Sequence, residues 1–528
     1  MKTIIKKFAP WLILSAVIYC VCALIETYFA LVLGEIIDSA VGNQLHTMLL
    51  QVGLAVLLLV GLLVFYRVAI EARRQYVMRC VTAIKKSLME AVYRRGLVNY
   101  NTNTESYYLN LLSNDMEMIE SDYLLPMPLI AFYIAQFLSS VGALFYLNWK
   151  IALFFMALTI LPIVVPPLFG SLLAKRKKIV SEQNESFMSV LKEQVQGMAD
   201  IQYNLAIHTF LKRFAEVNVK QQTAKKRAGV LETYLNECSS ICAAISQLGC
   251  IAIGGYFVIQ GEFLVGEMIA AIQLLNSVFS PISSFSQNYV QISGTSKIRK
   301  KIGEELANNQ SDGDGAVPAS PVSLDYDNVT IWYEGQDALV DHFTRHFGGN
   351  GFYAVIGGSG SGKTTLFKCL LKNHLDYSGE ILLNEKNIAS LSPQTIYQHV
   401  GFMPLAITLF HDTVEYNITL GNAYSEQELQ ELITKMGLTH LKGRVLHDGD
   451  TNISGGERQR IALARMLIRH PQIIVFDEPT ASLDPQNRDA VNALIAGLTQ
   501  YTRIVITHDQ RPEYLDQFDE VIDLAALA

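Results

Sequence analysis

Long apolar runs alternate with polar, basic stretches over the first 300 residues of the chain. Six of these runs come close to the roughly 20 residues that a helix needs to cross a hydrocarbon core of about 30 Å. The pattern therefore predicts an all-α membrane domain of six spanning helices. The expected spans are 8–34, 48–66, 123–147, 151–174, 237–259 and 268–292.

Lysine and arginine fall almost entirely on one side of these spans. They cluster after the second, fourth and sixth spans, whereas the three opposite loops together hold one lysine, Lys150. Because basic loops stay in the cytoplasm, we expect both termini there. The long inside connections, 67–122 and 175–236, are rich in helix formers. They should continue the membrane helices into the cytoplasm, with tips near 102–115 and 198–212.

The character of the chain changes at about residue 307. Residues 307–323, ANNQSDGDGAVPASPVS, are polar and rich in Gly, Pro and Ser, which is typical of a linker. Beyond them, short apolar runs alternate with helical patterns, as in a parallel α/β sheet. We therefore expect a membrane domain at 1–306, a linker at 307–323 and an α/β domain at 324–528.

Composition supports this division and excludes some functions. The chain is 50% hydrophobic and 17% charged, against about 25% charged residues in a soluble protein. The deficit indicates lipid-facing surface, and thus a lipid bilayer as partner. A net charge of −7 gives no basic excess for a nucleic-acid partner. The seven cysteines form no pair of CxxC motifs, so no zinc site is predicted.

A glycine-rich segment follows the expected strand Tyr353–Ile356 and precedes a helix. Its sequence, GGSGSGKT, fits the phosphate-loop pattern GxxxxGK[ST] in the structural setting that this loop requires. Backbone N–H groups and the helix N-terminus would face phosphate oxygens, Lys363 would reach the β- and γ-phosphates, and Thr364 would hold Mg²⁺. The candidate ATP ligands are Gly357, Gly358, Ser359, Gly360, Ser361, Gly362, Lys363, Thr364 and Thr365.

Two acids end the next strongly apolar run. Ile473–Phe476 predicts a strand buried on both faces, and Asp477 and Glu478 follow at its carboxyl end, where open α/β sheets bind ligands. Adjacent acids there require a cation, so Asp477 is a candidate Mg²⁺ ligand and Glu478 a candidate for polarising the attacking water. His508 follows another apolar strand and could help to position that water.

The segment NISGGERQRIALARM combines a helix signal with a possible anion site. Ser454 and Glu457 form a capping-box pattern before an amphipathic helix. Gly455 and Gly456 leave the N-terminus of this helix open to an anion. If the helix faces outward, it would serve the phosphate loop of a second copy.

With these motifs in place, the chain resembles the ATP-binding cassette transporters, and more narrowly a half-transporter of the six-helix exporter type. GGSGSGKTT resembles the Walker A loop, IIVFDE the Walker B strand and ISGGERQR the family signature. SLD at Ser482, Leu483 and Asp484 resembles the D-loop, His508 the switch histidine and Tyr333 the aromatic residue that stacks on adenine. The α/β domain is thus expected to be a P-loop NTPase.

This resemblance implies the family's mechanism at the matched positions. Two cassettes would close head to tail on ATP and Mg²⁺, with the signature of one facing the γ-phosphate held by the other. Closure would switch the membrane helices between inward-open and outward-open states, and hydrolysis at Glu478 would reset the cycle. A chain with one cassette needs a second half-transporter. We expect a multi-pass protein of the bacterial inner (plasma) membrane with its cassette in the cytoplasm.

Departures from the family pattern are also visible. Leu405, in Met403-Pro404-Leu405, stands where the family usually has a glutamine that contacts the Mg²⁺ and water region and relays closure. A leucine can do neither polar task. Glu457 replaces the usual glutamine of the signature; because a negative side chain would repel a γ-phosphate, we expect it to cap its own helix. Typical cassettes also continue beyond the point where this chain ends.

Polar side chains inside the predicted spans are candidates for solute contact. One stripe at helical spacing lies on the sixth span, and it would either line a substrate cavity or pack against another helix. Its members are Gln273, Asn276, Ser280, Ser284, Gln287 and Gln291. Glu26, in the first span, would either contact a cationic solute or lie near the outer leaflet edge.

The leading functional hypothesis is ATP-driven export of an amphiphilic solute such as a drug, a lipid, a peptide or a porphyrin-like molecule. Uptake of a metal chelate such as a siderophore by the same machinery is an alternative. A third possibility is a mainly regulatory, weakly hydrolysing half of a heterodimer, which Leu405 favours and which Glu478 and His508 oppose. A heterodimer with two unequal sites fits all three residues, and we favour it over a homodimer.

Overall fold

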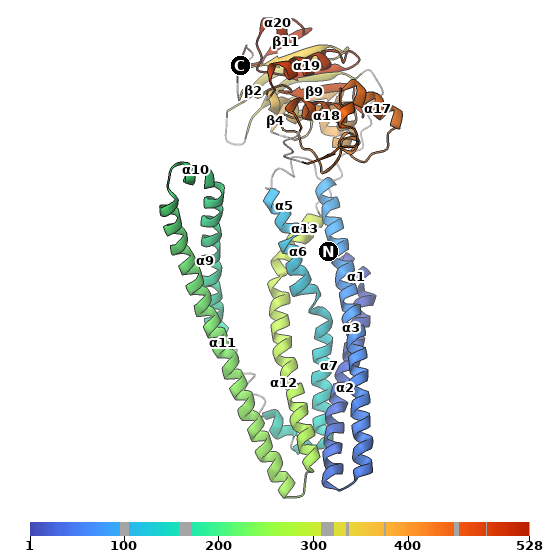
Figure 1. Cartoon of the computed structure of the whole chain (residues 1–528), viewed down its shortest axis with the longest axis vertical. Helices are drawn as coiled ribbons and strands as arrows, with labels where there is room; N and C mark the ends of the chain where they lie inside the picture. The colour runs from blue at the N-terminus through green and yellow to red at the C-terminus, as the bar shows by residue number, and fades with distance from the viewer. Residues whose placement is uncertain are drawn as a thin grey trace. The chain divides into compact units, whose positions relative to one another are not determined.

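Figure 1 shows the computed structural model of the chain, in which helices dominate the first three hundred residues and a mixed α/β domain follows. The described residues separate into two compact units, Met1–Leu88 with Leu109–Leu306 and Met89–Tyr108 with Ala307–Ala528. The structure describes all residues except 95–104, 151, 158–169, 308–321, 334–336, 359, 374–375, 448–452, 482 and 527–528. The predicted linker 307–323 thus lies almost wholly outside the described residues.

The first three hundred residues form long helices, as the apolar runs predict. The helices are α1 Lys2–Lys7, α2 Ala9–Val41, α3 Leu45–Arg94, α5 Glu105–Leu112, α6 Asn114–Ile119, the π-helical turn Glu120–Leu124, α7 Met127–Leu147, α9 Gly170–Gln196, α10 Met198–Tyr203, α11 Ile207–Ile259, α12 Val265–Gly294 and α13 Ser296–Ala307.

Five helical stretches of the described chain are long and apolar enough to cross a membrane. They are Ala9–Val41, Leu45–Tyr93, Tyr107–Leu147, Ile207–Ile259 and Val265–Gly294, and they contain the first, second, third, fifth and sixth predicted spans. Only 6% of the most apolar window of α3 is buried within the protein, so its apolar side chains need lipid around them. The fourth predicted span, 151–174, falls largely outside the described residues.

The helices continue well beyond a membrane's thickness, as expected for the inside connections. α3 has 50 residues and α11 has 53, which is about 75 and 80 Å of helix at 1.5 Å per residue. α9 and α11 run side by side and α10 closes their tip (Figure 1). α10 therefore lies at the predicted second tip, near 198–212.

α2, α7 and α12 pack against one another in the membrane unit. α2 and α12 approach most closely where two glycines meet: a Cβ on Gly34 would lie 2.7 Å from the Gly266 carbonyl oxygen, and a Cβ on Gly266 would lie 2.0 Å from that of Gly34. The carboxylate of Asp38 accepts a hydrogen bond from the Gly266 N–H (2.7 Å). Larger residues are therefore excluded at this crossing, near the C-terminal end of α2 and the N-terminal end of α12.

The cassette is built on a five-stranded parallel sheet of order β11-β3-β10-β9-β6. Its strands are β3 Phe352–Ile356, β6 Val400–Met403, β9 Ile473–Asp477, β10 Thr502–Ile506 and β11 Glu520–Asp523. Alternate strand residues enter two separate cores: Ile474 and Phe476 of β9 face one, and Ile473 and Val475 face the other. Burial on both faces explains why β9 is apolar without alternation.

A second, antiparallel sheet of order β2-β1-β4-β5 completes one of these cores. Its strands are β1 Leu324–Ile331, β2 Val340–Phe347, β4 Tyr377–Leu383 and β5 Lys386–Asn387, and a short pair, β7 Asp412–Thr413 and β8 Val445–Leu446, lies apart from both sheets. The cassette helices are α14 Lys363–Leu370, α15 Pro393–His399, α16 Val414–Thr419, α17 Glu426–Lys435, α18 Gly455–Leu467, α19 Pro485–Ala496 and α20 Pro512–Leu515, with 3-10 turns at Ile388–Ser390, Thr439–Leu441 and Leu524–Ala526.

Candidate functional site

Three neighbouring strands bring the predicted nucleotide residues to one edge of the parallel sheet. β10 lies between β3 and β9, and Ile506 pairs with Val355 on one side and Asp477 on the other. The glycine-rich loop follows β3, Glu478 follows β9 and His508 follows β10. Because parallel strands end at the same edge, motifs more than a hundred residues apart converge there.

The glycine-rich loop bends in a way that requires glycine. Gly360 has φ 81° and Gly362 φ 87°, and a Cβ on Gly362 would lie 2.5 Å from the Val340 side chain. Gly362 is the N-cap of α14, so the next residue, Lys363, opens the helix. The Lys363 ammonium donates hydrogen bonds to the carbonyl oxygens of Gly357 and Gly358, each at 2.8 Å.

Burial shapes the electrostatics of this loop. It lowers the pKa of the Lys363 ammonium, an effect that the carboxylates of Glu478 and Asp477 oppose. It raises the pKa of Asp477, against the hydrogen bond that Thr364 Oγ1 donates to Asp477 Oδ1 at 2.8 Å. Both charged groups would therefore gain from ligands of opposite sign, a phosphate for Lys363 and a cation for Asp477.

An unpartnered hydroxyl indicates that the loop fits an anion. Ser361 Oγ is buried and has no hydrogen-bond partner among the described residues. A buried donor left unpaired costs about 1–3 kcal/mol, which a phosphate oxygen would recover. Ser359 is outside the described residues. Thr365 is buried, and its hydroxyl lies 3.3 Å from the hydroxyl of Tyr333, a residue that is 40% exposed.

Glu478 and His508 contact each other directly. His508 Nε2 lies 2.9 Å from Glu478 Oε1. Glu478 has φ 49°, in the left-handed region, and its N–H donates to the Ile506 carbonyl oxygen at 3.0 Å. Such a backbone costs a non-glycine residue roughly 1 kcal/mol, and it turns this carboxylate toward the edge of the sheet.

The signature residues form the N-terminus of α18. Ser454 is its N-cap and Glu457 completes a capping box: Ser454 Oγ accepts from the Glu457 N–H (3.2 Å), and Glu457 Oε2 accepts from the Ser454 N–H (2.8 Å). The expectation that Glu457 caps its own helix is confirmed. Its other oxygen contacts His440 Nε2 at 2.6 Å. Burial alone would raise the pKa of Glu457, but the hydrogen bonds from His440 and Ser454 hold it below its usual value.

The predicted D-loop adjoins this helix start. Asp484 is the N-cap of α19 and accepts from the backbone N–H of Asn487 (3.1 Å) and from its side-chain amide (2.6 Å). A Cβ on Gly456 would lie 2.8 Å from Asn487 Oδ1, so the glycine permits the two helix starts to touch. Leu483 is partly buried against the core, and Ser482 is outside the described residues.

Leu405 lies just beyond β6, and its side chain is 50% exposed. The loop that carries it is held by arginines of α18, which sequence reasoning did not identify. Arg458 donates to the Ile407 carbonyl oxygen (3.4 Å) and Arg465 to that of Thr408 (3.0 Å). The available signal was two basic residues seven positions apart on an amphipathic helix.

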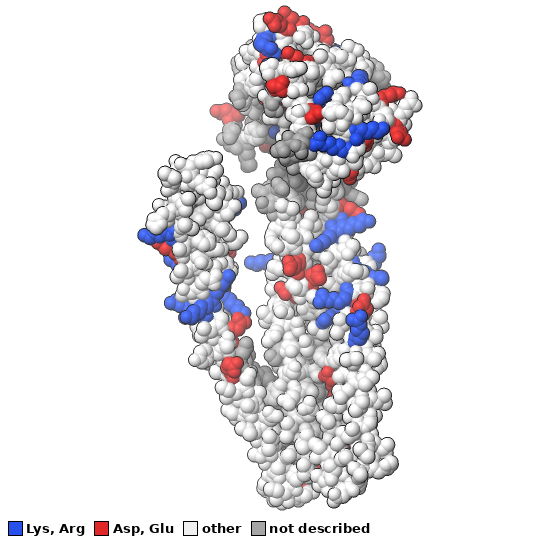
Figure 2. Space-filling model, viewed as in Figure 1, with Lys and Arg blue, Asp and Glu red and all other residues white. Residues whose placement is uncertain are grey.

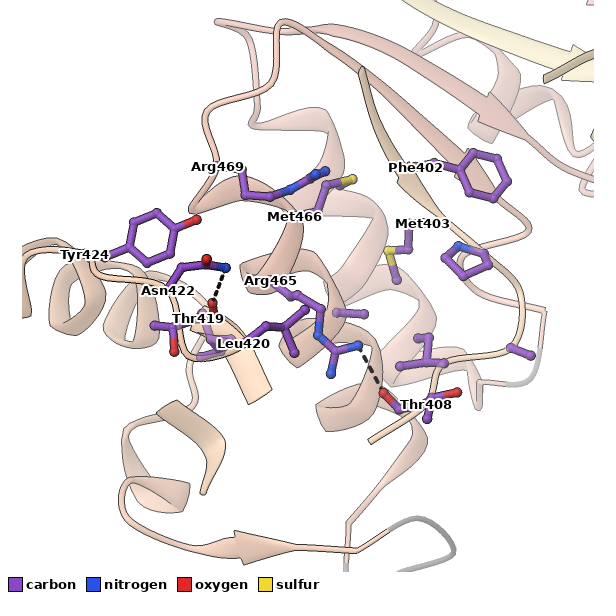
Figure 3. Close-up of a pocket in the computed structure, with 15 residues that line it drawn as sticks. Phe402, Met403, Thr408, Thr419, Leu420, Asn422, Tyr424, Arg465, Met466 and Arg469 are labelled. Carbon is purple, nitrogen blue, oxygen red and sulfur yellow. Dashed lines mark hydrogen bonds between the residues drawn. The ribbon is translucent and has the colours of Figure 1, made fainter. Parts of the chain in front are cut away.

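A pocket of about 310 Å³ lies between this loop and α18 (Figure 3). The end of β6, α18 and the segment around Thr419–Tyr424 form its walls. Arg465 and Arg469 are its two charged lining residues, and Met403, Ile407 and Met466 are among the apolar ones. Leu405 does not line the pocket, although both of its neighbours do.

The predicted stripe on α12 is largely uncovered in the single chain. Gln273, Asn276, Ser280, Gln287 and Gln291 are exposed. Ser284 is half-buried. Close packing of this stripe against another helix of the same chain is therefore not observed among the described residues.

Comparison with known protein families agrees with this geometry. The family model for the ABC transporter transmembrane region matches residues 12–282, about half of the chain, and the ABC transporter model matches residues 343–481. The chain belongs to the ABC transporter family. It is a fused exporter-type half-transporter with a helical membrane domain before its nucleotide-binding domain, and an ATPase coupled to transport.

Individual relatives are distant but extend over most of the chain. The ABC transporter ATP-binding protein YwjA of Bacillus subtilis, which is uncharacterised, is 24% identical over 92% of this chain and 87% of its own length. The ATP-dependent lipid A-core flippase of Syntrophus aciditrophicus is 25% identical over 81% of this chain and 74% of the flippase. The structure of a bacterial Atm1-family ABC exporter with ATP bound superimposes with a TM-score of 0.78 at 17% identity, covering 99% of this chain and 94% of the exporter. ABC exporters act as dimers within the bilayer, so this half-transporter needs a second half.

Proposed function

We propose that the residues at the sheet edge bind and hydrolyse ATP to drive export of an amphiphilic solute. The observation that carries this is the convergence of Lys363, Asp477, Glu478 and His508 at the ends of three adjacent strands. Lys363 would exchange its two loop carbonyls for β- and γ-phosphate oxygens, and Ser361 and the loop N–H groups would donate to the same phosphates. Tyr333 would stack on adenine.

Thr364 and Asp477 would hold Mg²⁺. They are already joined by a hydrogen bond of 2.8 Å, and a hydroxyl and a carboxylate are oxygen ligands that Mg²⁺ prefers. When bound, this ion supplies positive charge that offsets the charge of the phosphates. The leucine side chain at position 405 has no oxygen or nitrogen with which to add a ligand.

Glu478 and His508 would position and activate the attacking water. Glu478, aimed at the sheet edge by its left-handed backbone, would accept a proton or orient the water. His508 Nε2 would hold Glu478 in position and could turn to a γ-phosphate oxygen. Their separation of 2.9 Å supports a shared role.

The exposed start of α18 supports head-to-tail dimerisation. Ser454 and Gly455 are exposed, and the helix N-terminus carries partial positive charge suited to a phosphate. Because the Glu457 carboxylate is turned back onto Ser454 and His440, it would not repel the anion. These residues would complete the ATP site of the partner.

The pocket beside Leu405 would take part in coupling ATP hydrolysis to the membrane domain. Its walls are largely apolar, and Arg465 and Arg469 line it. Arg465 belongs to α18, which starts with the signature residues, so a change at this pocket would reach the exposed start of the helix.

The proposal also concerns the transported solute and the second half of the transporter. The uncovered polar stripe on α12 favours a cavity for a solute with both polar and apolar parts, and the relative named as a lipid flippase moves such a molecule. Leu405 favours a non-identical second half, so that the two ATP sites differ. We place both termini and the cassette in the cytoplasm, at the inner membrane of a bacterium.

ATPase assays on the purified transporter in lipid nanodiscs test this function. Glu478→Gln should lower turnover by at least about 100-fold, the size of a general-base contribution, with ATP still bound. Lys363→Ala should instead weaken nucleotide binding. The control is Glu380→Gln, an exposed residue on β4, which should match wild type. Unchanged turnover in Glu478→Gln would reject the assigned role.

A further inference from the structure

Glu26 lies deep in the membrane unit and not near the outer leaflet edge. It is eight residues before Gly34, the end of the predicted span 8–34, which is about 12 Å along the helix axis. Since the hydrocarbon core is about 30 Å thick, this position lies well inside it. Figure 2 shows few Lys, Arg, Asp or Glu side chains over the lower part of these helices on the face toward the viewer. From Ala9 to Gly34, α2 has no charged residue other than Glu26.

Two neutral side chains from other helices hold its carboxylate. Tyr66 Oη, on α3, donates to Glu26 Oε1 at 2.5 Å, and Gln136 Nε2, on α7, donates to Glu26 Oε2 at 2.6 Å. Among the described residues, no lysine or arginine lies within 4.0 Å of the carboxylate. The charge of Glu26, when ionised, is therefore not neutralised by the part of the chain that the structure describes.

The carboxylate of Glu26 can also accept more hydrogen bonds than the two that it receives from Tyr66 and Gln136. Its two oxygens offer about four acceptor positions, and Tyr66 and Gln136 occupy two. Burying such a group without a countercharge is expensive, and an intramembrane acid is by default a functional residue. A ligand that brings both a hydrogen-bond donor and a positive charge would fill a free acceptor position of the carboxylate and neutralise its charge.

A small cavity opens beside Glu26. It has a volume of about 100 Å³ and lies between α2, α3 and α12. Leu58, Leu59 and Leu62 form an apolar wall, and Gln273 and Ser277 supply polar groups from α12. Gln273 is also the first member of the uncovered polar stripe. The cavity therefore connects the acid with the helix face already suspected of contacting solute.

We propose that Glu26 recognises a protonated amine on the transported solute, with Gln273 and Ser277 as further hydrogen-bond partners. A volume of about 100 Å³ is that of roughly three water-sized groups, enough for an ammonium head and its first carbons. The leucines would contact the attached apolar part. This inference rests on the proposed transport of an amphiphilic solute, and it narrows that solute to a cationic amphiphile.

The test compares two probes that differ in the charged head alone. Decylamine is protonated at pH 7, whereas decanol has the same chain and no charge. ATPase activity is measured against the concentration of each probe, with the assembled transporter in nanodiscs of zwitterionic lipid. Wild type should respond to decylamine at a concentration about tenfold or more below that for decanol, since hydrogen bonds to charged groups are the strong ones.

Glu26→Gln should abolish the preference, so that the two probes act at the same concentration. Glu35→Gln is the matched control, because Glu35 is an exposed acid on the same helix nearer its outer end, and the preference should persist. Tyr66→Phe should also keep it, because the carboxylate remains. If Glu26→Gln does not assemble, Glu26→Asp is tested instead. Its side chain is one carbon shorter and holds the carboxylate farther from the cavity, so the preference for decylamine over decanol should fall at least threefold.

Other outcomes separate this inference from the function on which it rests. Equal responses to the two probes in wild type, no response to either, or a preference that survives in Glu26→Gln would each overturn the amine site while leaving the ATPase intact. A transporter without basal ATPase would instead contradict the proposed function. Reduced thermal stability in both Glu26→Gln and Tyr66→Phe, with the preference kept in both, would assign Glu26 a purely structural role.

Discussion

At the scale of single residues, Glu478 and His508 are in direct contact at the sheet edge, with 2.9 Å between Oε1 and Nε2. Each is supported by its own strand end, Glu478 after β9 and His508 after β10. Residues that act as a unit give mutational effects that are far from additive. The pair therefore makes a sharper prediction than either residue alone.

His508→Ala should reduce ATPase turnover by about 10- to 100-fold, because Glu478 loses the side chain that orients it. The double variant Glu478→Gln/His508→Ala should be no slower than Glu478→Gln by itself. Steady-state ATPase rates of the four proteins at saturating ATP provide the measurement. Independent, multiplicative losses would show that the contact has no part in the reaction.

Leu405 leads to a prediction about coupling. Leu405 is exposed, and it stands between Pro404 and Ala406, which both line the pocket at the end of β6. Leu405→Gln would add a polar group able to reach Mg²⁺ or water. We expect the number of ATP molecules hydrolysed per solute transported to change at least twofold, with ATP affinity within twofold of wild type.

Leu405→Met, which adds no hydrogen-bonding amide, serves as the control for this change. Parallel measurements of transport, turnover and nucleotide affinity are needed. A large shift in affinity with unchanged coupling would contradict the interpretation of this position.

At the scale of elements, α18 links three features of the cassette. Its first turn is the capping box, its inner face packs in the core, and its arginines hold the loop after β6. Arg465 also donates to the carbonyl oxygen of Asn417 at 2.7 Å. The helix thus connects a predicted phosphate contact with the pocket proposed for coupling.

Removing the capping box should destabilise the cassette. Glu457→Ala is expected to cost about 1 kcal/mol at pH 7, which lowers the midpoint of thermal unfolding by about 2–4 °C for a domain of this size. Because the pKa of folded Glu457 lies below the usual 4.5, its contribution is complete above that pH and is lost as pH falls through the folded value. The difference between variant and wild type should therefore shrink at pH 4 and below.

Glu457→Gln separates the two parts of this contribution, since glutamine can cap the helix but brings no carboxylate charge to its contact with His440. It should fall between wild type and Glu457→Ala at pH 7. Scanning calorimetry at several pH values provides the measurement. A difference that stays constant down to pH 3 would contradict the role of the carboxylate charge.

Removing the arginine bridge should have a larger effect. Arg465→Met keeps the bulk of the side chain but leaves the carbonyl oxygens of Thr408 and Asn417 without this donor. We expect a loss of about 2–3 kcal/mol, because hydrogen bonds from charged groups are worth about 1.5–3 kcal/mol each. Chemical unfolding of the cassette measures it, with Arg465→Lys as the partial rescue. An unchanged midpoint would show that the loop does not depend on α18.

Local sequence patterns predicted the elements that are decided locally. The glycine-rich loop, the strand Ile473–Asp477 and the capping box each need only a dozen consecutive residues. Contacts between distant segments left no such trace: Arg465 and Thr408 are 57 residues apart, and Glu26 and Gln136 are 110 apart. Glu26 was visible as an unusual acid in the sequence, but its two neutral partners could be identified only from the fold.

At the scale of the whole molecule, one chain holds one phosphate loop and one signature, so in the head-to-tail dimer that we propose each ATP site would draw on two chains. Lys363→Ala and Gly455→Glu would disable opposite halves of such a site. Gly455 is exposed and opens α18, so a side chain there is compatible with the fold.

Co-expression of these two variants distinguishes a homodimer from a heterodimer. In a homodimer, one intact site forms and ATPase returns to about a quarter of wild type or more. In the heterodimer that we favour, mixing the two variants restores no ATPase activity. Each variant paired with its natural second half keeps one of the two ATP sites. ATPase rates and mass photometry of the purified complexes decide. Recovery in the mixture would reject the heterodimer.

The glycine contact between α2 and α12 has a mechanical consequence for transport. With backbone against backbone at Gly34 and Gly266, tilting of one helix against the other turns about this point. Glu26 is eight residues from Gly34, about 12 Å, whereas Ala9 is 25 residues away, about 38 Å. A tilt that moves Ala9 by about 6 Å therefore moves Glu26 by about 2 Å. Glu26 therefore lies close to the pivot point of the two helices. Around it, the distance between α2 and α12 would change little, while the ends of these helices far from the glycine contact would separate.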